Sequence, residues 1–87
     1  MKRKKLLEKL GEYLSADHRE QLKRKESLKK LLHNLREKRD ELKAEIAATA
    51  DTDERERLQA KLDVLAAQRE KGLQLLKNLQ GATPDSG

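Results

Sequence analysis

Two stripes of apolar residues, separated by one short acidic segment, dominate the pattern of hydrophobic and polar positions in this chain. Both stripes advance in alternating steps of four and three residues, the spacing that keeps side chains on one face of an α-helix. The first stripe consists of Leu28, Leu32, Leu35, Arg39, Leu42 and Ile46, and the second of Leu58, Leu62, Leu65, Arg69, Gly72, Leu76 and Leu79. The pattern predicts two long amphipathic helices and no β-strand.

The segment between the stripes is too short to form an element of its own, and helices joined by so short a connection fold back as antiparallel neighbours. We therefore expect an all-α fold whose main feature is a long, coiled-coil-like helical hairpin. Its helices are expected at about 18–48 and 53–80, with the turn at 49–52.

Two acidic pairs are alternative caps for the second helix of the hairpin. Asp51 is followed by Glu54, and Asp53 by Glu56, at the spacing of an N-terminal capping box. Their carboxylates also face the positive end of the helix dipole. Capping therefore explains the acidic tip without a further role for it. At the other end, Gly81 is suited to a left-handed C-terminal cap.

The N-terminal region carries a shorter amphipathic pattern, in which Leu6, Leu7, Leu10, Tyr13 and Leu14 share one face. Asp17, with Glu20 three residues later, has the spacing of a capping box, so we expect a helix break near Ser15. One unbroken helix from residue 2 to residue 48 is the alternative, because no proline interrupts this segment. The expected organisation is a basic amphipathic helix over 1–15, the hairpin over 16–80 and a disordered tail over 81–87.

The composition favours solvent-exposed helices over a large globular core. Charged residues make up 43% of the 87 residues and hydrophobic ones only 34%, with no Phe, no Trp and one Tyr. High charge with few aromatics is also typical of disordered chains. Disorder, however, gives no reason for leucines at helical spacing, so we expect residues 18–80 to be ordered.

The apolar stripe widens at the open end of the hairpin, where antiparallel pairing places Leu28 near Leu76. The residues expected at helix–helix contacts are Leu22, Leu28, Leu31, Leu32, Leu35, Leu42, Ile46, Leu58, Leu62, Leu65, Leu73, Leu76 and Leu79. Two helices bury only one seam, and soluble proteins rarely expose so wide an apolar patch. The N-terminal helix, a second copy of the chain or a foreign partner must therefore cover it.

Of these three, the N-terminal helix offers a matching face, but about thirteen residues of helix are only ~20 Å long. Such a helix covers less than half of the hairpin. We therefore expect a homodimeric helical bundle in preference to a compact three-helix monomer.

Arg39 and Arg69 interrupt the stripes where leucine is expected. One interpretation is that each aliphatic stem covers the seam while the guanidinium reaches solvent. The other is that the two arginines lower the stability of the hairpin and so fix its register or its choice of partner.

The net charge of +5 is unevenly distributed, since residues 1–30 carry eleven basic and five acidic side chains. A basic surface attracts phosphates without regard to sequence, and the candidate phosphate contacts are Lys4, Lys5, Arg19, Lys23 and Lys30. A simple solvated face, with acids interleaved, is the alternative interpretation. A membrane surface is not expected as a partner, because the amphipathic segment is short and lacks a Trp or Phe anchor.

The sequence contains no pattern that predicts catalysis. It has no cysteine and no Gly-rich phosphate loop, and His18 and His33 lack the spacing of a helical zinc site. We expect no enzyme activity, no cofactor, no metal and no small-molecule substrate. The basic start at residues 2–5 is typical of a signal peptide, but Glu8 and Glu12 interrupt the apolar core that would follow. Cytoplasmic residence is expected.

The leading hypothesis is a non-enzymatic helical interaction module that mediates protein–protein association through leucine seams, with itself or with a partner helix. The alternative hypothesis is a nucleic-acid-binding accessory protein that uses the basic N-terminal third. Ionic strength discriminates between the two, because phosphate binding weakens steeply with salt while a leucine seam does not.

Overall fold

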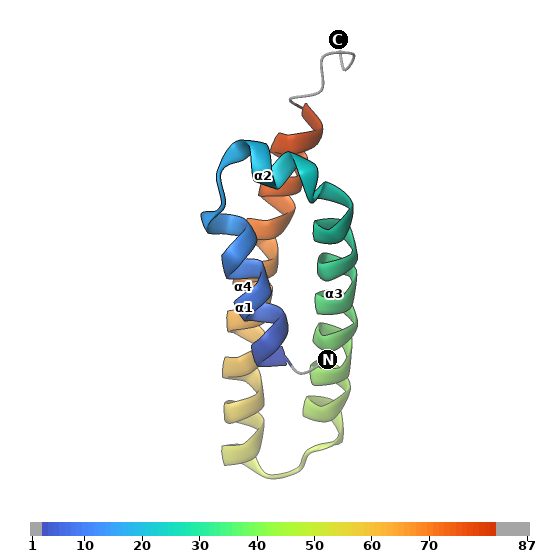
Figure 1. The fold of residues 1–87 in the computed structure, drawn as a ribbon. Coiled ribbons are helices and arrows are strands. Elements are labelled where there is room, and N and C mark those ends of the chain that lie inside the picture. Colours follow the sequence, from blue (N-terminus) through green and yellow to red (C-terminus); the bar gives the residue numbers. More distant parts are fainter. Residues whose placement is uncertain (1–2, 82–87) are drawn as a thin grey trace.

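The computed structural model describes residues 3–81, which form four helices and short connections. These are α1 (Arg3–Ser15), α2 (His18–Lys23), α3 (Lys25–Ala48) and α4 (Thr52–Gly81). Figure 1 shows α3 and α4 packed antiparallel, with α1 lying against their open end. The molecule is elongated, with extents of 51 × 23 × 17 Å. The all-α fold and the long hairpin expected from the two stripes are confirmed.

Side-chain caps set where α2 and α4 begin. The backbone N–H of Glu20 donates to Oδ1 of Asp17 at 2.8 Å, so the expected break after Ser15 is present. The backbone N–H of Glu54 donates to Oδ2 of Asp51 at 3.2 Å, which selects Asp51 over Asp53 as the cap of α4. Both bonds satisfy N–H groups that a helix start leaves without a partner.

The C-terminal end of α4 differs from the expectation. Gly81 is the last residue of α4, and no glycine between residues 3 and 81 has a positive φ. The left-handed cap expected at Gly81 is therefore not formed. The tail expected to be disordered lies, from residue 82 on, outside the described residues.

The helix expected over 18–48 is divided in two at Arg24, which has φ −105° and ψ 20°. The backbone hydrogen bonds continue across the division, since Arg24 N–H donates to Glu20 O at 3.1 Å and Leu28 N–H to Arg24 O at 3.0 Å. The bend follows from contacts with α1. The buried amide of Gln21 donates to the carbonyl of Tyr13 at 2.9 Å, and the Arg24 guanidinium lies 4.6 Å from the centre of the Tyr13 ring.

The core is one cluster of apolar side chains to which three helices contribute. Its buried members are Leu6, Leu10 and Tyr13 of α1, Leu28, Leu31, Leu32, Leu35 and Leu42 of α3, and Leu58, Leu62, Leu65 and Leu79 of α4. Helix α1 thus covers the open end of its own hairpin. The compact three-helix arrangement is therefore formed within one chain, although the sequence favoured a homodimer. The homodimer itself stays a prediction.

Four of the residues expected at helix contacts lie outside the buried set. Ile46, Leu73 and Leu76 are only partly buried against the core. Leu22 keeps 42% of its surface exposed and lies outside the core. The bend at Arg24 separates α2 from α3, and Leu22 of α2 does not join the core that α3 forms with α1 and α4.

Toward the turn, the hairpin continues as a two-helix arm, which we define as residues 42–62 and which α1 reaches only with Arg3 at its first residue. Helix α1 has 13 residues, against 24 in α3 and 30 in α4. In the arm, Leu42 and Leu62 each keep 9% of their surface exposed, whereas Leu28, Leu35 and Leu65 at the covered end keep none. The arm therefore has a single, less completely buried seam.

Gly72 lies at the point where α1, α3 and α4 meet. A Cβ atom added to this buried glycine would lie 2.6 Å from Cδ2 of Leu32 and 2.9 Å from Cδ1 of Leu10. Those distances are too short for ordinary contacts. The glycine in the second stripe thus makes room for α1 and α3 to pack closely on α4.

The two helical glycines provide a matched test of this packing. Alanine at the exposed Gly11 meets nothing within 4 Å, so Gly11→Ala should raise the free energy of unfolding by up to about 1 kcal/mol through helix propensity. Gly72→Ala gains the same propensity but must displace two core leucines, an overpacking cost of about 1–3 kcal/mol. Urea unfolding followed by circular dichroism should therefore show Gly72→Ala to be the less stable variant. Equal stability of the two variants would contradict close packing at Gly72.

Candidate interaction surfaces

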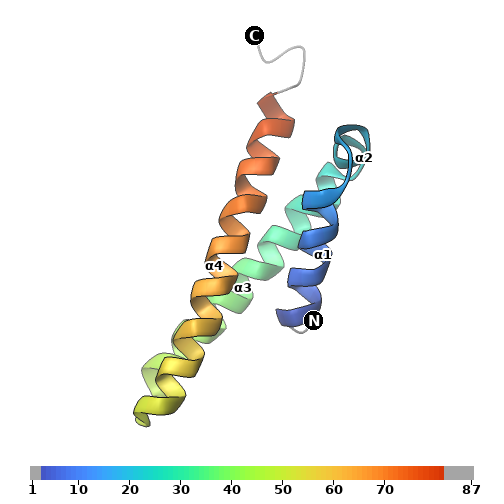
Figure 2. The same cartoon turned by 90° about the vertical axis from the view of Figure 1, so that its left-hand side faces the viewer.

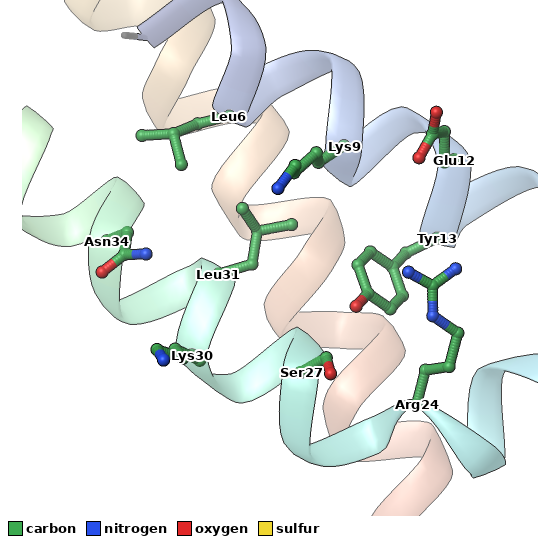
Figure 3. A pocket seen from close by; sticks show the side chains of 9 residues that line it. All are labelled: Leu6, Lys9, Glu12, Tyr13, Arg24, Ser27, Lys30, Leu31 and Asn34. Carbon is green, nitrogen blue, oxygen red and sulfur yellow. The ribbon is translucent and has the colours of Figure 1, made fainter. Parts of the chain in front are cut away.

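A groove of about 360 Å³ lies between α1 and α3 near the bend at Arg24. It is lined by Leu6, Lys9, Glu12 and Tyr13 from the α1 side, and by Arg24, Ser27, Lys30, Leu31 and Asn34 from the α3 side. Figure 3 shows Lys9 reaching from α1 toward Leu31, and the Arg24 guanidinium beside the Tyr13 ring.

The groove combines an apolar floor with a basic rim. Leu6, Tyr13 and Leu31 are buried, whereas Lys9, Lys30 and Arg24 are exposed, with Glu12 as the only acid in the lining. Such a rim attracts anions. Tyr13, however, keeps only 5% of its surface exposed and is covered by Arg24, so it offers no free ring on which a nucleic-acid base could stack.

The candidate phosphate contacts do not gather at one place. Lys30 lines the groove, where it joins Lys9 and Arg24, two cations not selected as phosphate contacts from the sequence. The remaining candidates, Lys4, Lys5, Arg19 and Lys23, are exposed and do not line the groove. Lys9 and Lys30 line the same groove because of the way α1 packs on α3. This packing cannot be derived from the order of charges along the sequence.

A second basic surface lies on the side of the hairpin that α1 leaves uncovered. Figure 2 shows α1 on one side of α3 and α4, with no described helix on the other. Asn34, Lys38 and Glu41 line the spaces next to α1. Residues two positions apart on an α-helix point about 200° apart, so Arg36 and Lys43 point away from α1. We call this side the uncovered face.

Three arginines form a cluster on the uncovered face, Arg36 and Arg39 from α3 and Arg69 from α4. Nε of Arg69 donates to the carbonyl of Leu32 across the helix interface at 3.3 Å. Burial lowers the pKa of Arg69 below its usual value, and repulsion by Arg39 and Arg36 lowers it further. This arginine cluster therefore concentrates like charge at one place.

Carboxylates balance only part of this charge. Oδ1 of Asp40 accepts hydrogen bonds from Nε and Nη2 of Arg39, each at 3.3 Å. Asp40 and Glu70 also favour the charged form of Arg69. Arg69 thus spans the seam as a snorkelling side chain does, and Arg39 and Arg36 disfavour its charged form.

The histidines and the acidic tip form ordinary surface contacts. Nε2 of His33 lies 2.9 Å from Oε1 of Glu37, one helical turn away, and His18 is exposed. Among residues 3–81, no group of three or more His, Cys, Asp or Glu side chains could hold a metal ion. At the tip, Asp51 is used as the cap of α4. No described helix is both long and apolar enough to cross a membrane.

The fold and these surfaces define a small three-helix unit from which a two-helix arm projects. Comparison with protein-family models, with curated proteins and with solved structures finds no match for this chain. The features that bear on its function are therefore the two basic surfaces and the apolar side chains that the fold leaves partly exposed.

Replacing Arg69 by leucine should stabilise the fold. Burying a leucine side chain stabilises a fold by ~1.5–3 kcal/mol, and a leucine at this partly buried position gains part of that. The substitution also removes the repulsion among the arginines. It loses one hydrogen bond, which contributes roughly 0.5–1.5 kcal/mol. We expect Arg69→Leu to raise the free energy of unfolding by about 1 kcal/mol in urea titrations. The increase should shrink at high salt, which screens the repulsion in the wild type.

The matched control for this substitution is Arg57→Leu, because Arg57 is exposed on the same helix. That variant should change the stability by less than about 0.5 kcal/mol. If Arg69→Leu were less stable than the wild type at every salt concentration, Arg69 would stabilise the seam and the repulsion would be unimportant.

Proposed function

We propose that this chain is a non-enzymatic helical interaction module that associates through helix–helix contact, with a second copy or with a helix of another protein. The observation that carries the proposal is the set of apolar side chains left partly exposed after α1 has packed. Leu7, Leu14, Ile46, Leu73, Leu75 and Leu76 are partly buried against the core, and Leu22 and Val64 are 42% and 51% exposed.

These side chains lie at spacings that a docking helix could use. Leu73 and Leu76 are three residues apart on α4, and Leu7 and Leu14 are seven apart on α1, so each pair shares a helix face. Full burial of a leucine is worth about 1.5–3 kcal/mol. Completing the burial of several of them gives a helix–helix contact a favourable free energy that depends little on salt.

Sedimentation velocity tests the self-associating form of this proposal. At ~100 µM, well above weak dissociation constants, we expect a mass greater than the 10.0 kDa of one chain, and a similar distribution at low and high salt. A 10.0 kDa species at that concentration would exclude the homodimer. The proposal would then require a helix of another protein as the partner.

A nucleic-acid-binding accessory protein is the second candidate. Lys9, Arg24 and Lys30 line the groove between α1 and α3, and Lys4, Lys5 and Lys23 are exposed elsewhere in the basic N-terminal third. Phosphates require little more than such positive charge. This binding would be independent of sequence, because Tyr13 is packed under Arg24 and no other aromatic residue occurs in the chain.

Charge reversal tests the second candidate. Changing Lys4, Lys5, Lys23 and Lys30 together to glutamate should leave the helicity intact, because all four are exposed. Affinity for duplex DNA or RNA should fall steeply, most clearly at low salt, in fluorescence anisotropy titrations. The control reverses four exposed cations of α4: Arg57, Lys61, Lys71 and Lys77. Unchanged duplex binding by the first variant would rule out the basic N-terminal surface as the contact.

A further inference from the structure

The uncovered face carries a row of cations along the whole of α3. Lys25, Lys29, Arg36 and Lys43 follow one another at intervals of four, seven and seven residues, which keeps them on one side of the helix. Arg39 lies beside this row, at the contact with α4. The row is therefore longer than the groove at α1, and it includes residues from beyond the basic N-terminal third.

Near the open end, helix α4 adds Arg69 and two leucines to the face. Arg69 is tied to α3 through the carbonyl of Leu32. Leu73 and Leu76 lie four and seven residues further along, on the same side of α4 as Arg69. Both leucines are only partly buried, so apolar surface runs beside the arginine cluster.

The apolar surface resumes toward the tip of the arm. A shallow space there is lined by Ile46, Thr52, Arg55, Glu56 and Gln59, so one acid and one cation lie beside the isoleucine. Lys61 lines the space that Arg3 of α1 enters, and Gln59, two residues away on the helix, points to the opposite side. The space at Ile46 therefore belongs to the uncovered face, which has partly buried apolar side chains at both ends and arginines between them.

Nearby acids leave the face with an excess of positive charge. Glu26 lies 3.5 Å from Lys29, Asp40 is bonded to Arg39, and Glu70 favours the charged form of Arg69. Within residues 3–81, no ion pair shorter than 4 Å involves Lys25, Arg36 or Lys43. Their charge is available to a partner.

We propose that the uncovered face binds an acidic amphipathic helix of another protein, which lies between α3 and α4 as the fourth helix of a bundle. The apolar stripe of that helix packs on Leu73, Leu76 and Ile46. Its carboxylates meet the arginine cluster, whose guanidinium groups bind carboxylates in a bidentate manner. This inference rests on the proposed function and adds the docking surface and the chemistry of the partner.

Two observations favour an acidic helix over a nucleic acid or a second copy of this chain. Phosphates make no use of an apolar floor, and the single aromatic ring, Tyr13, lies at the other groove. The exposed start of α4 alternates acids with Arg55 and Arg57, so this chain does not itself supply a continuous acidic stripe.

A pair of synthetic peptides tests the proposal with the full-length protein. One fluorescently labelled peptide of about three heptads carries leucine at the a and d positions and glutamate around them, and the matched peptide carries lysine in place of glutamate. We expect the acidic peptide to bind the wild type at least about tenfold more tightly than the basic one, as charge complementarity requires.

Two double variants locate the contact. Arg36→Glu with Lys43→Glu changes exposed residues of the uncovered face, and should weaken binding of the acidic peptide at least about tenfold. Lys9→Glu with Lys30→Glu makes the same change in net charge at the groove beside α1, and should leave the affinity within about threefold, as for charges outside a contact. Circular dichroism verifies that both variants remain helical.

Four results would overturn the assignment. Equal loss in both variants would mean that net charge alone attracts the peptide. Binding of duplex DNA that Arg36→Glu with Lys43→Glu abolishes, without binding of the acidic peptide, would assign the face to phosphates. If neither peptide binds while the wild type sediments as a dimer, the interaction module stands and the uncovered face is not its docking surface. If neither peptide binds and the protein is monomeric, both proposals fail in their present form.

Discussion

The packing of α1 against the open end of the hairpin is the contact on which the rest of the molecule depends. It requires a glycine at position 72, because Leu10 of α1 and Leu32 of α3 occupy the space where a side chain would be. By covering one side of α3 and α4, α1 completes the core and leaves the opposite side uncovered. Because α1 is short, it also leaves most of the arm as two helices without a third. The core, the arm and both basic surfaces follow from where this one helix docks.

The parts of the fold that depend on local pattern could be predicted from the sequence. Leucine spacing predicted the hairpin, and Asp17 and Asp51 could be identified as caps because a cap needs only the residues next to it. The bend at Arg24 could not be predicted, since it has neither proline nor glycine and arises from contacts of Gln21 and Arg24 with Tyr13. The same bend leaves Leu22 outside the core of one chain, so the helix–helix contact expected for it stays a prediction.

The candidate surfaces were harder to predict from the sequence than the fold. The distribution of charge along the chain predicted a basic surface within the first thirty residues. In the structure, the lysines of that segment lie on several helices. The arginine cluster joins residues thirty or more positions apart in the sequence, and its side of the hairpin is defined only by the absence of α1. One signal was present in the sequence, because Arg39 and Arg69 interrupt both leucine stripes. Their spacing alone did not reveal that they lie together.

The arm has a consequence for the dynamics of the chain. Its helices are joined by one seam of incompletely buried side chains, while the other end of the hairpin is enclosed on a third side by α1. Segments with few buried apolar contacts open at a lower free energy than the rest of a protein. The arm can therefore open and close locally while the three-helix end stays folded. Amide protons near the turn then exchange with solvent sooner than those around Gly72, and the protein has a rigid end and a compliant end within a single continuous hairpin.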